Sequence, residues 1–120
     1  MEGGISNYLQ NQLKQAQQIE GQIEQLNNQK YQMDLRIKEL TKTLEELEKI
    51  GDNTPIYRSV GPVLYKVEDK AKLVEELKEQ KELSEIRIKT IEKQQKSLEE
   101  KYKEIEQLIQ KTYQDSQKNQ

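Results

Sequence analysis

The sequence predicts a mainly α-helical fold, an antiparallel two-helix coiled coil with one β-hairpin between the helices. Composition is the first observation behind this prediction. Only 32% of the 120 residues are hydrophobic and 35% are charged, while 20 Lys and Arg nearly balance 22 Asp and Glu. A globular core needs closer to half apolar residues, and disordered chains usually carry a large net charge. The other two observations are a sustained heptad pattern and a cluster of turn residues at 51–62 that divides the chain.

The first helix is expected over residues 5–50, where apolar residues recur at alternating steps of four and three. With Leu9 taken as an a position, only Gln12 and Lys30 interrupt the seam. A period of 3.5 residues kept for about six heptads is typical of a coiled coil. We expect Lys30 to extend its ammonium group to water or to set the register. The apolar seam residues are Ile5, Leu9, Ala16, Ile19, Ile23, Leu26, Met33, Ile37, Leu40, Leu44 and Leu47.

The second helix is expected over residues 69–115, with Asp69 as its N-cap. Its seam follows the same heptads but includes several polar residues, so it suits a partner helix in the same chain better than a parallel dimer. The helices are nearly equal in length and the segment between them is short, which favours antiparallel packing with both chain ends together. Partner residues should then have numbers that sum to about 121. The polar seam residues are Lys70, Lys81, Ser84, Gln95 and Thr112.

The β-hairpin is expected over residues 54–67. Two runs rich in β-branched and aromatic residues, 55–60 and 63–67, are separated by Gly61-Pro62. An isolated two-stranded hairpin is only marginally stable in water, so it must either fold back on the coiled coil or pair with another subunit. Charged residues crowd the adjoining helix ends, which favours pairing between subunits. The expected oligomerisation residues are Ile56, Tyr57, Val60, Val63, Leu64, Tyr65 and Val67.

Several functional classes are disfavoured by what the chain lacks. Without Cys or His it has no thiol nucleophile, imidazole base or usual zinc ligand set, so we expect no enzyme activity, cofactor or metal site. A net charge of -2 argues against nucleic acid as a partner. No apolar run is long enough for a membrane span, and the N-terminus lacks the apolar stretch of a signal peptide. An intracellular protein is the default expectation.

Two segments are the most specific parts of the sequence. They are the hairpin core Ile56-Tyr57-Arg58-Ser59-Val60-Gly61 and the helical segment Lys81-Glu82-Leu83-Ser84-Glu85-Ile86-Arg87-Ile88-Lys89-Thr90-Ile91-Glu92-Lys93-Gln94. Both resemble the prefoldin family, specifically its β-class subunits. The resemblance covers nearly the whole chain, so residues 1–120 are interpreted as a single prefoldin β-type domain. One hairpin is typical of the β class, whereas the α class has two. The string Gly61-Pro62-Val63-Leu64 also resembles the eukaryotic subunit six, so an archaeal β subunit and a eukaryotic homologue both stay open.

The resemblance implies a hetero-hexamer of two α-class and four β-class subunits whose hairpins join in an inter-subunit β-barrel. It further implies a cytoplasmic chaperone without ATP or another cofactor. Such a chaperone binds unfolded client proteins at the coiled-coil tips, prevents their aggregation and delivers them to a group II chaperonin. The alternative is a coiled-coil scaffold or oligomerisation protein with no client-binding role.

Residue composition at the chain ends indicates where clients would bind. Residues 1–32 contain 13 Gln or Asn and five charges, and residues 107–120 contain six Gln or Asn and three charges. Apolar residues there extend beyond the a and d positions, which would give an adaptable surface for non-native chains. Alternatively, they only widen the seam of an ordinary helix pair. The expected client-binding residues are Ile5, Tyr8, Leu9, Leu13, Leu108, Ile109 and Tyr113.

Overall fold

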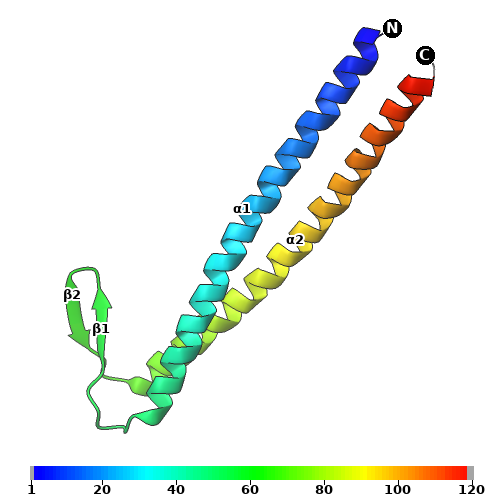
Figure 1. Ribbon diagram of the computed structural model, residues 1–120. Helices are drawn as coiled ribbons and strands as arrows, with labels where there is room; N and C mark the ends of the chain where they lie inside the picture. Colours follow the sequence, from blue (N-terminus) through cyan, green and yellow to red (C-terminus); the bar gives the residue numbers. More distant parts are fainter. Residues whose placement is uncertain (1, 119–120) are drawn as a thin grey trace. The chain divides into compact units, whose positions relative to one another are not determined.

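The chain folds into two long helices joined by a two-stranded hairpin (Figure 1). The computed structural model describes the backbone of residues 2–118 and the side chains of residues 6–117. In order, the elements are α1 (Glu2–Lys49), β1 (Tyr57–Val60), β2 (Val63–Lys66) and α2 (Lys70–Lys118). This confirms the predicted mainly α-helical class with one antiparallel hairpin between the helices. The described chain divides into two compact units.

The helix boundaries follow local chemistry more than the seam. Helix α1 already begins at Glu2 and α2 continues to Lys118, where the heptads suggested residues 5 and 115. A helix can extend beyond its last seam residue because its backbone hydrogen bonds do not depend on the seam. The start of α2 is set by a cap, since Asp69 Oδ1 accepts a hydrogen bond from the backbone N–H of Lys72 at 3.1 Å. The predicted N-cap is therefore confirmed.

The first unit consists of Met1–Lys30 and Thr90–Gln120. Within it the two helices run antiparallel, and the beginning of α1 lies beside the end of α2 (Figure 1). Ile19 and Ile91 are buried between them, and only 1% of the Ile91 surface is exposed. Burying such a side chain contributes about 1.5–3 kcal/mol. Cross-helix polar contacts join residues whose numbers sum to 122, close to the expected register: Glu20 with Tyr102, Asn27 with Gln95, and Lys30 with Glu92.

The second unit is Tyr31–Lys89 and contains the hairpin with the helix segments that flank it. Leu40 and Leu47 of α1 are the buried apolar residues of its seam. Across the helices, Arg36 donates to Gln80 Oε1 at 3.0 Å. The described seam residues of both units are buried or half-buried, and most other helical positions are exposed. The heptad assignment therefore predicted the packed face of both helices.

The hairpin turn depends on Gly61, which is the residue between β1 and Pro62 that reverses the chain. Its φ is +56°, in the left-handed region where a Cβ atom would be strained. Glycine at the first central position followed by Pro62, whose ring holds φ negative, matches a type II′ hairpin turn. The register pairs Tyr57 with Lys66, Arg58 with Tyr65, Ser59 with Leu64, and Val60 with Val63.

Candidate functional site

The hairpin exposes apolar side chains on both of its faces. Because side chains alternate along a strand, Val60, Val63 and Tyr65 share one face with Arg58, while Tyr57 and Leu64 lie on the other. The predicted oligomerisation residues within the strands are between 46% and 66% exposed: Tyr57, Val60, Val63, Leu64 and Tyr65. A surface of this kind, with no covering layer in the described chain, is typical of a protein interaction site.

The remaining two predicted oligomerisation residues lie at the base of the hairpin. Ile56 and Val67 are half-buried, and the Val67 N–H donates to the Ile56 carbonyl oxygen at 2.8 Å. This bond extends the pairing by one step beyond the strands. Since the sheet has only two strands, each strand also leaves one edge of N–H and C=O groups without a strand partner in the described chain. The hairpin therefore offers both apolar side chains and sheet edges to a partner.

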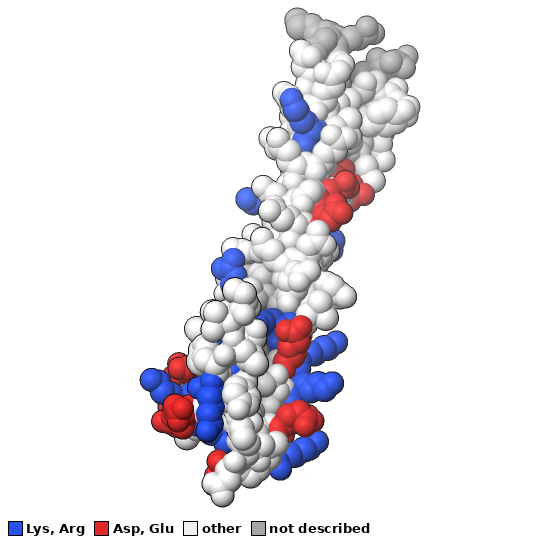
Figure 2. Space-filling model, turned by 90° about the vertical axis from the view of Figure 1, so that its left-hand side faces the viewer, with Lys and Arg blue, Asp and Glu red and all other residues white. Residues whose placement is uncertain are grey.

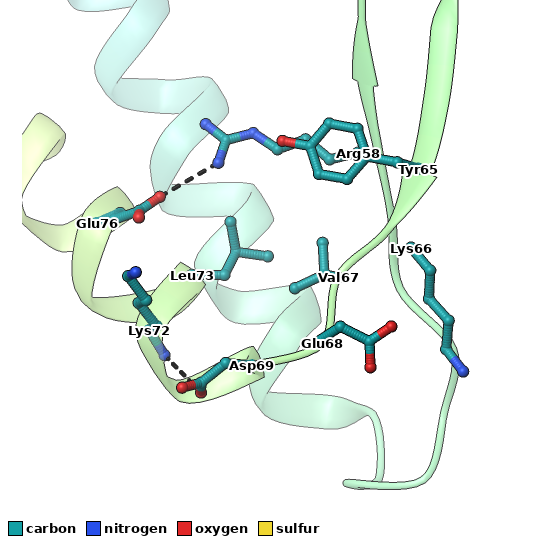
Figure 3. A pocket seen from close by; sticks show the side chains of 9 residues that line it. All are labelled: Arg58, Tyr65, Lys66, Val67, Glu68, Asp69, Lys72, Leu73 and Glu76. Atoms are coloured by element: carbon teal, nitrogen blue, oxygen red, sulfur yellow. Dashed lines mark hydrogen bonds and ion pairs between the residues drawn. The ribbon is translucent and has the colours of Figure 1, made fainter.

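A shallow cavity of about 270 Å³ lies between the hairpin and the first turns of α2 (Figure 3). Tyr65 and Val67 line it from the hairpin side, and Leu73 lines it from α2. At its edge, Arg58 Nη1 lies 3.2 Å from Glu76 Oε2, forming an ion pair in which both side chains are about two-fifths exposed. The sequence pattern contains no signal for this pair, because the residues are 18 positions apart and lie in different elements.

The junction of the two helices is held by Lys70, which the heptad pattern marked only as a polar interruption of the seam. Lys70 Nζ donates to the carbonyl oxygen of Ile50 at 3.0 Å and lies 3.9 Å from Asp52 Oδ1. Carbonyl groups at a helix C-terminus lack intrahelical partners and carry partial negative charge, so an ammonium group there is stabilising. Lys70 therefore ties the start of α2 to the end of α1.

The predicted client-binding residues lie in the first unit, near the chain ends. Tyr8, Leu13, Leu108 and Tyr113 are 39–56% exposed, whereas Leu9 and Ile109 are half-buried in the seam. The side chain of Ile5 lies outside the described residues. The structure thus separates this set into exposed residues beside the seam and seam residues that hold the two helices together.

Polar groups interrupt the seam of the same unit. Gln95 is buried and donates to Asn27 Oδ1, so its amide is paired. Lys30 reaches Glu92 at 3.6 Å with its side chain 37% exposed, in line with the expected extension toward water. Gln12 differs, because its Oε1 atom is buried without a hydrogen-bond partner among the described residues. An unsatisfied buried acceptor costs about 1–3 kcal/mol, so the seam is weakened at this position.

Tyr102 adds a further polar contact across the first unit. Its hydroxyl donates to Glu20 Oε1 at 2.6 Å. This hydrogen bond, together with the negative charge of the Glu20 carboxylate, raises the pKa of the Tyr102 phenol above its usual 10.0. The phenol therefore stays protonated, and remains a donor, at any physiological pH.

Charged side chains are distributed unevenly over the face seen in Figure 2. They crowd around the hairpin, whose own surface is mainly uncharged, and they are sparse on the helix segments near the chain ends. Within the described residues, no group of three or more His, Cys, Asp and Glu side chains is placed to bind a metal ion. Neither described helix contains a stretch long and apolar enough to cross a membrane. Within the described residues, the hairpin and the exposed apolar side chains near the chain ends both fit a binding role.

Known proteins match this chain over most of its length. A family model described as "Prefoldin subunit" matches residues 10–116. The chain is 61% identical over 113 residues to the prefoldin subunit beta of Thermoplasma volcanium, covering 94% of this chain and 91% of that protein. It is 62% identical, with the same coverage, to the prefoldin subunit beta of Thermoplasma acidophilum.

A solved structure shares the fold. The crystal structure of the prefoldin beta subunit from Thermococcus strain KS-1 aligns with a TM-score of 0.76 at 36% sequence identity. The alignment covers 87% of this chain and 90% of that one. That protein is also named as a beta subunit.

Proposed function

The chain belongs to the prefoldin family, and from this premise we propose that it is a β-class subunit of an ATP-independent chaperone. In this proposal its hairpin joins the hairpins of α-class and other β-class subunits in a hetero-hexamer with an inter-subunit β-barrel. The free ends of its coiled coil hold unfolded proteins in the cytoplasm, prevent their aggregation and release them to a group II chaperonin. The subunit acts by binding, without catalysis or a cofactor.

One observation carries the assembly part of the proposal. The strand residues Tyr57, Val60, Val63, Leu64 and Tyr65 are about half exposed or more on a sheet of only two strands. Such a hairpin is marginal by itself, and edge strands of this kind pair readily with other strands. Neighbouring hairpins would cover these side chains and satisfy both edges at once. The hairpin, rather than the seam, is therefore the assembly element.

The exposed apolar residues near the chain ends support the client-binding part. Tyr8, Leu13, Leu108 and Tyr113 present apolar surface where few charges lie nearby, and a two-helix seam does not need them. Exposed apolar segments of an unfolded protein would bury area against them. The surrounding Gln and Asn side chains would offer hydrogen bonds without fixed charge.

Two measurements test the proposal. Mixing the chain with the α-class subunit of the same organism should give a hetero-hexamer in size-exclusion chromatography with light scattering. A monomer or simple dimer in that mixture would reject the assembly role. The hexamer should also suppress aggregation of a chemically unfolded protein in a light-scattering assay without added ATP.

A combined variant, Tyr8→Ser, Leu13→Ser, Leu108→Ser and Tyr113→Ser, tests the placement of client binding. We expect it to keep the hexamer, because these side chains lie outside the hairpin and the seam, and to lose most of the aggregation suppression. The matched control changes the exposed Tyr31 and Leu35 of the second unit to Ser. Full suppression by the combined variant would reject the placement. An intact hexamer of wild-type chains that suppresses no aggregation would instead favour the scaffold alternative.

A further inference from the structure

The hairpin forms an arm that is attached to the two helices through short connections. Its pairing continues below the strands through the 2.8 Å bond between the Val67 N–H and the Ile56 carbonyl oxygen. Only residues 67–69 connect β2 to α2, and residues 50–56 connect α1 to β1. The strand side chains are largely exposed, so packing against the helices covers little of the arm. Its direction relative to α2 therefore depends on the few contacts near its base.

The ion pair between Arg58 and Glu76 is placed to fix that direction. Arg58 belongs to β1 and Glu76 to the second turn of α2, and their closest charged atoms are 3.2 Å apart. Figure 3 shows the Arg58 side chain, beside the ring of Tyr65, reaching across the edge of the cavity to Glu76, with Leu73 and Val67 lining the cavity. Because the hairpin is not packed tightly against α2 here, this contact bridges a space that side chains do not fill.

We propose that Arg58 and Glu76 are positioning residues that hold the hairpin in the direction required for pairing with neighbouring subunits. This inference rests on the proposed assembly role. A hairpin already held in its bound direction loses less orientational freedom when it associates, so the same contacts between subunits give tighter assembly. A partly exposed pair of this kind contributes little to the stability of the chain itself. Its main effect is therefore on assembly rather than on folding.

Charge reversal separates this role from a direct contact between Arg58 and a neighbouring subunit. The variants R58E and E76R should each weaken assembly with the α-class subunit by about ten-fold, because each places like charges together at the bridge. The double variant R58E/E76R restores an attractive pair with the two charges exchanged. We expect it to assemble at a subunit concentration within about three-fold of the one that wild type requires. The matched control is E46K, which disrupts the exposed Lys49–Glu46 pair on α1 and should not change assembly.

A direct measurement of hairpin direction does not depend on assembly. The chain contains no Cys, so the double variant S59C/K78C accepts spin labels at one strand site and one α2 site only. The distance distribution in the isolated chain should be narrow and should broaden when R58E or E76R is added. The double reversal should narrow it again.

The outcomes distinguish the inference from the function on which it rests. Failure of the wild-type chain to assemble would reject the proposed function. Normal assembly by wild type together with normal assembly by both single variants would overturn the positioning role alone. A double reversal that assembles as poorly as R58E would also overturn it, because it would show that Arg58 acts on the neighbouring subunit instead of on Glu76.

Discussion

Replacing Gln12 with Leu should stabilise the coiled coil of the first unit. Gln12 lies at a seam position, and its Oε1 atom is buried with no hydrogen-bond partner in the part of the chain that the structure describes. Leaving such an acceptor unsatisfied costs about 1–3 kcal/mol, and Leu removes it and places an apolar side chain of similar length in the seam. Buried apolar area adds about 25 cal/mol per Å². We therefore expect the free energy of unfolding to rise by about 1–3 kcal/mol.

Urea denaturation followed by circular dichroism measures this change, and hydrogen exchange of the backbone amides locates it. Protection should increase mainly for amides of residues 6–20, because the added stability lies in that part of the seam. The matched control is Gln10→Leu at an exposed position of the same helix, which should change stability by less than about 0.5 kcal/mol. A destabilised or unchanged Q12L variant would refute the reasoning, since it would mean that the Gln12 amide is satisfied in solution.

Three further substitutions probe the core, the turn and the tyrosine contact. Ile91→Ala should lower the free energy of unfolding by about 2–5 kcal/mol, while Leu83→Ala, at a side chain 66% exposed, should change it by less than about 0.5 kcal/mol in the same denaturation experiment. Gly61→Ala should lower the free energy of unfolding by about 1–2 kcal/mol, because a Cβ atom is strained at φ +56°, and it should weaken assembly. Gly21→Ala within α1 should instead raise the free energy of unfolding by about 1 kcal/mol. The opposite pair of signs would contradict the turn assignment. The pKa of Tyr102 is higher in the folded state than in the unfolded state. The contribution of its hydrogen bond to the free energy of unfolding is therefore complete below pH 10.0 and is lost as the pH rises through the pKa of the folded state. Wild type should therefore lose stability relative to Tyr102→Phe in alkaline titrations, and parallel pH profiles would argue against the hydrogen bond.

The packed faces of both helices were predictable from the chain alone. The seam positions assigned from Leu9 onward are buried or half-buried in the structure, including polar ones such as Gln95. This follows because a repeat of 3.5 residues keeps one stripe of an α-helix facing its partner, whatever the residues on it are. The N-cap at Asp69 and the turn at Gly61 were equally readable, since each depends on the chemistry of a few consecutive residues.

The polar contacts of the candidate sites were not predictable in the same way. Periodicity placed Lys70 and Gln95 on the seam but did not reveal that one binds the Ile50 carbonyl oxygen and the other the Asn27 amide. It also gave no indication that the Gln12 Oε1 atom would find no hydrogen-bond partner among the described residues. Such contacts depend on side-chain rotamers and on small shifts of one helix along the other, and a pattern of residue types does not specify either.

The sequence by itself determined that this chain is a helix–hairpin–helix, which faces its helices pack, and that it resembles the prefoldin family. Those features come from local propensity and from periods repeated along the chain. Only the tertiary structure decided how the hairpin is held against α2, because the Arg58–Glu76 pair forms between elements whose relative direction depends on the connections at 50–56 and 67–69. A contact between residues distant in the chain exists only after those connections have taken one path, and no local rule selects that path.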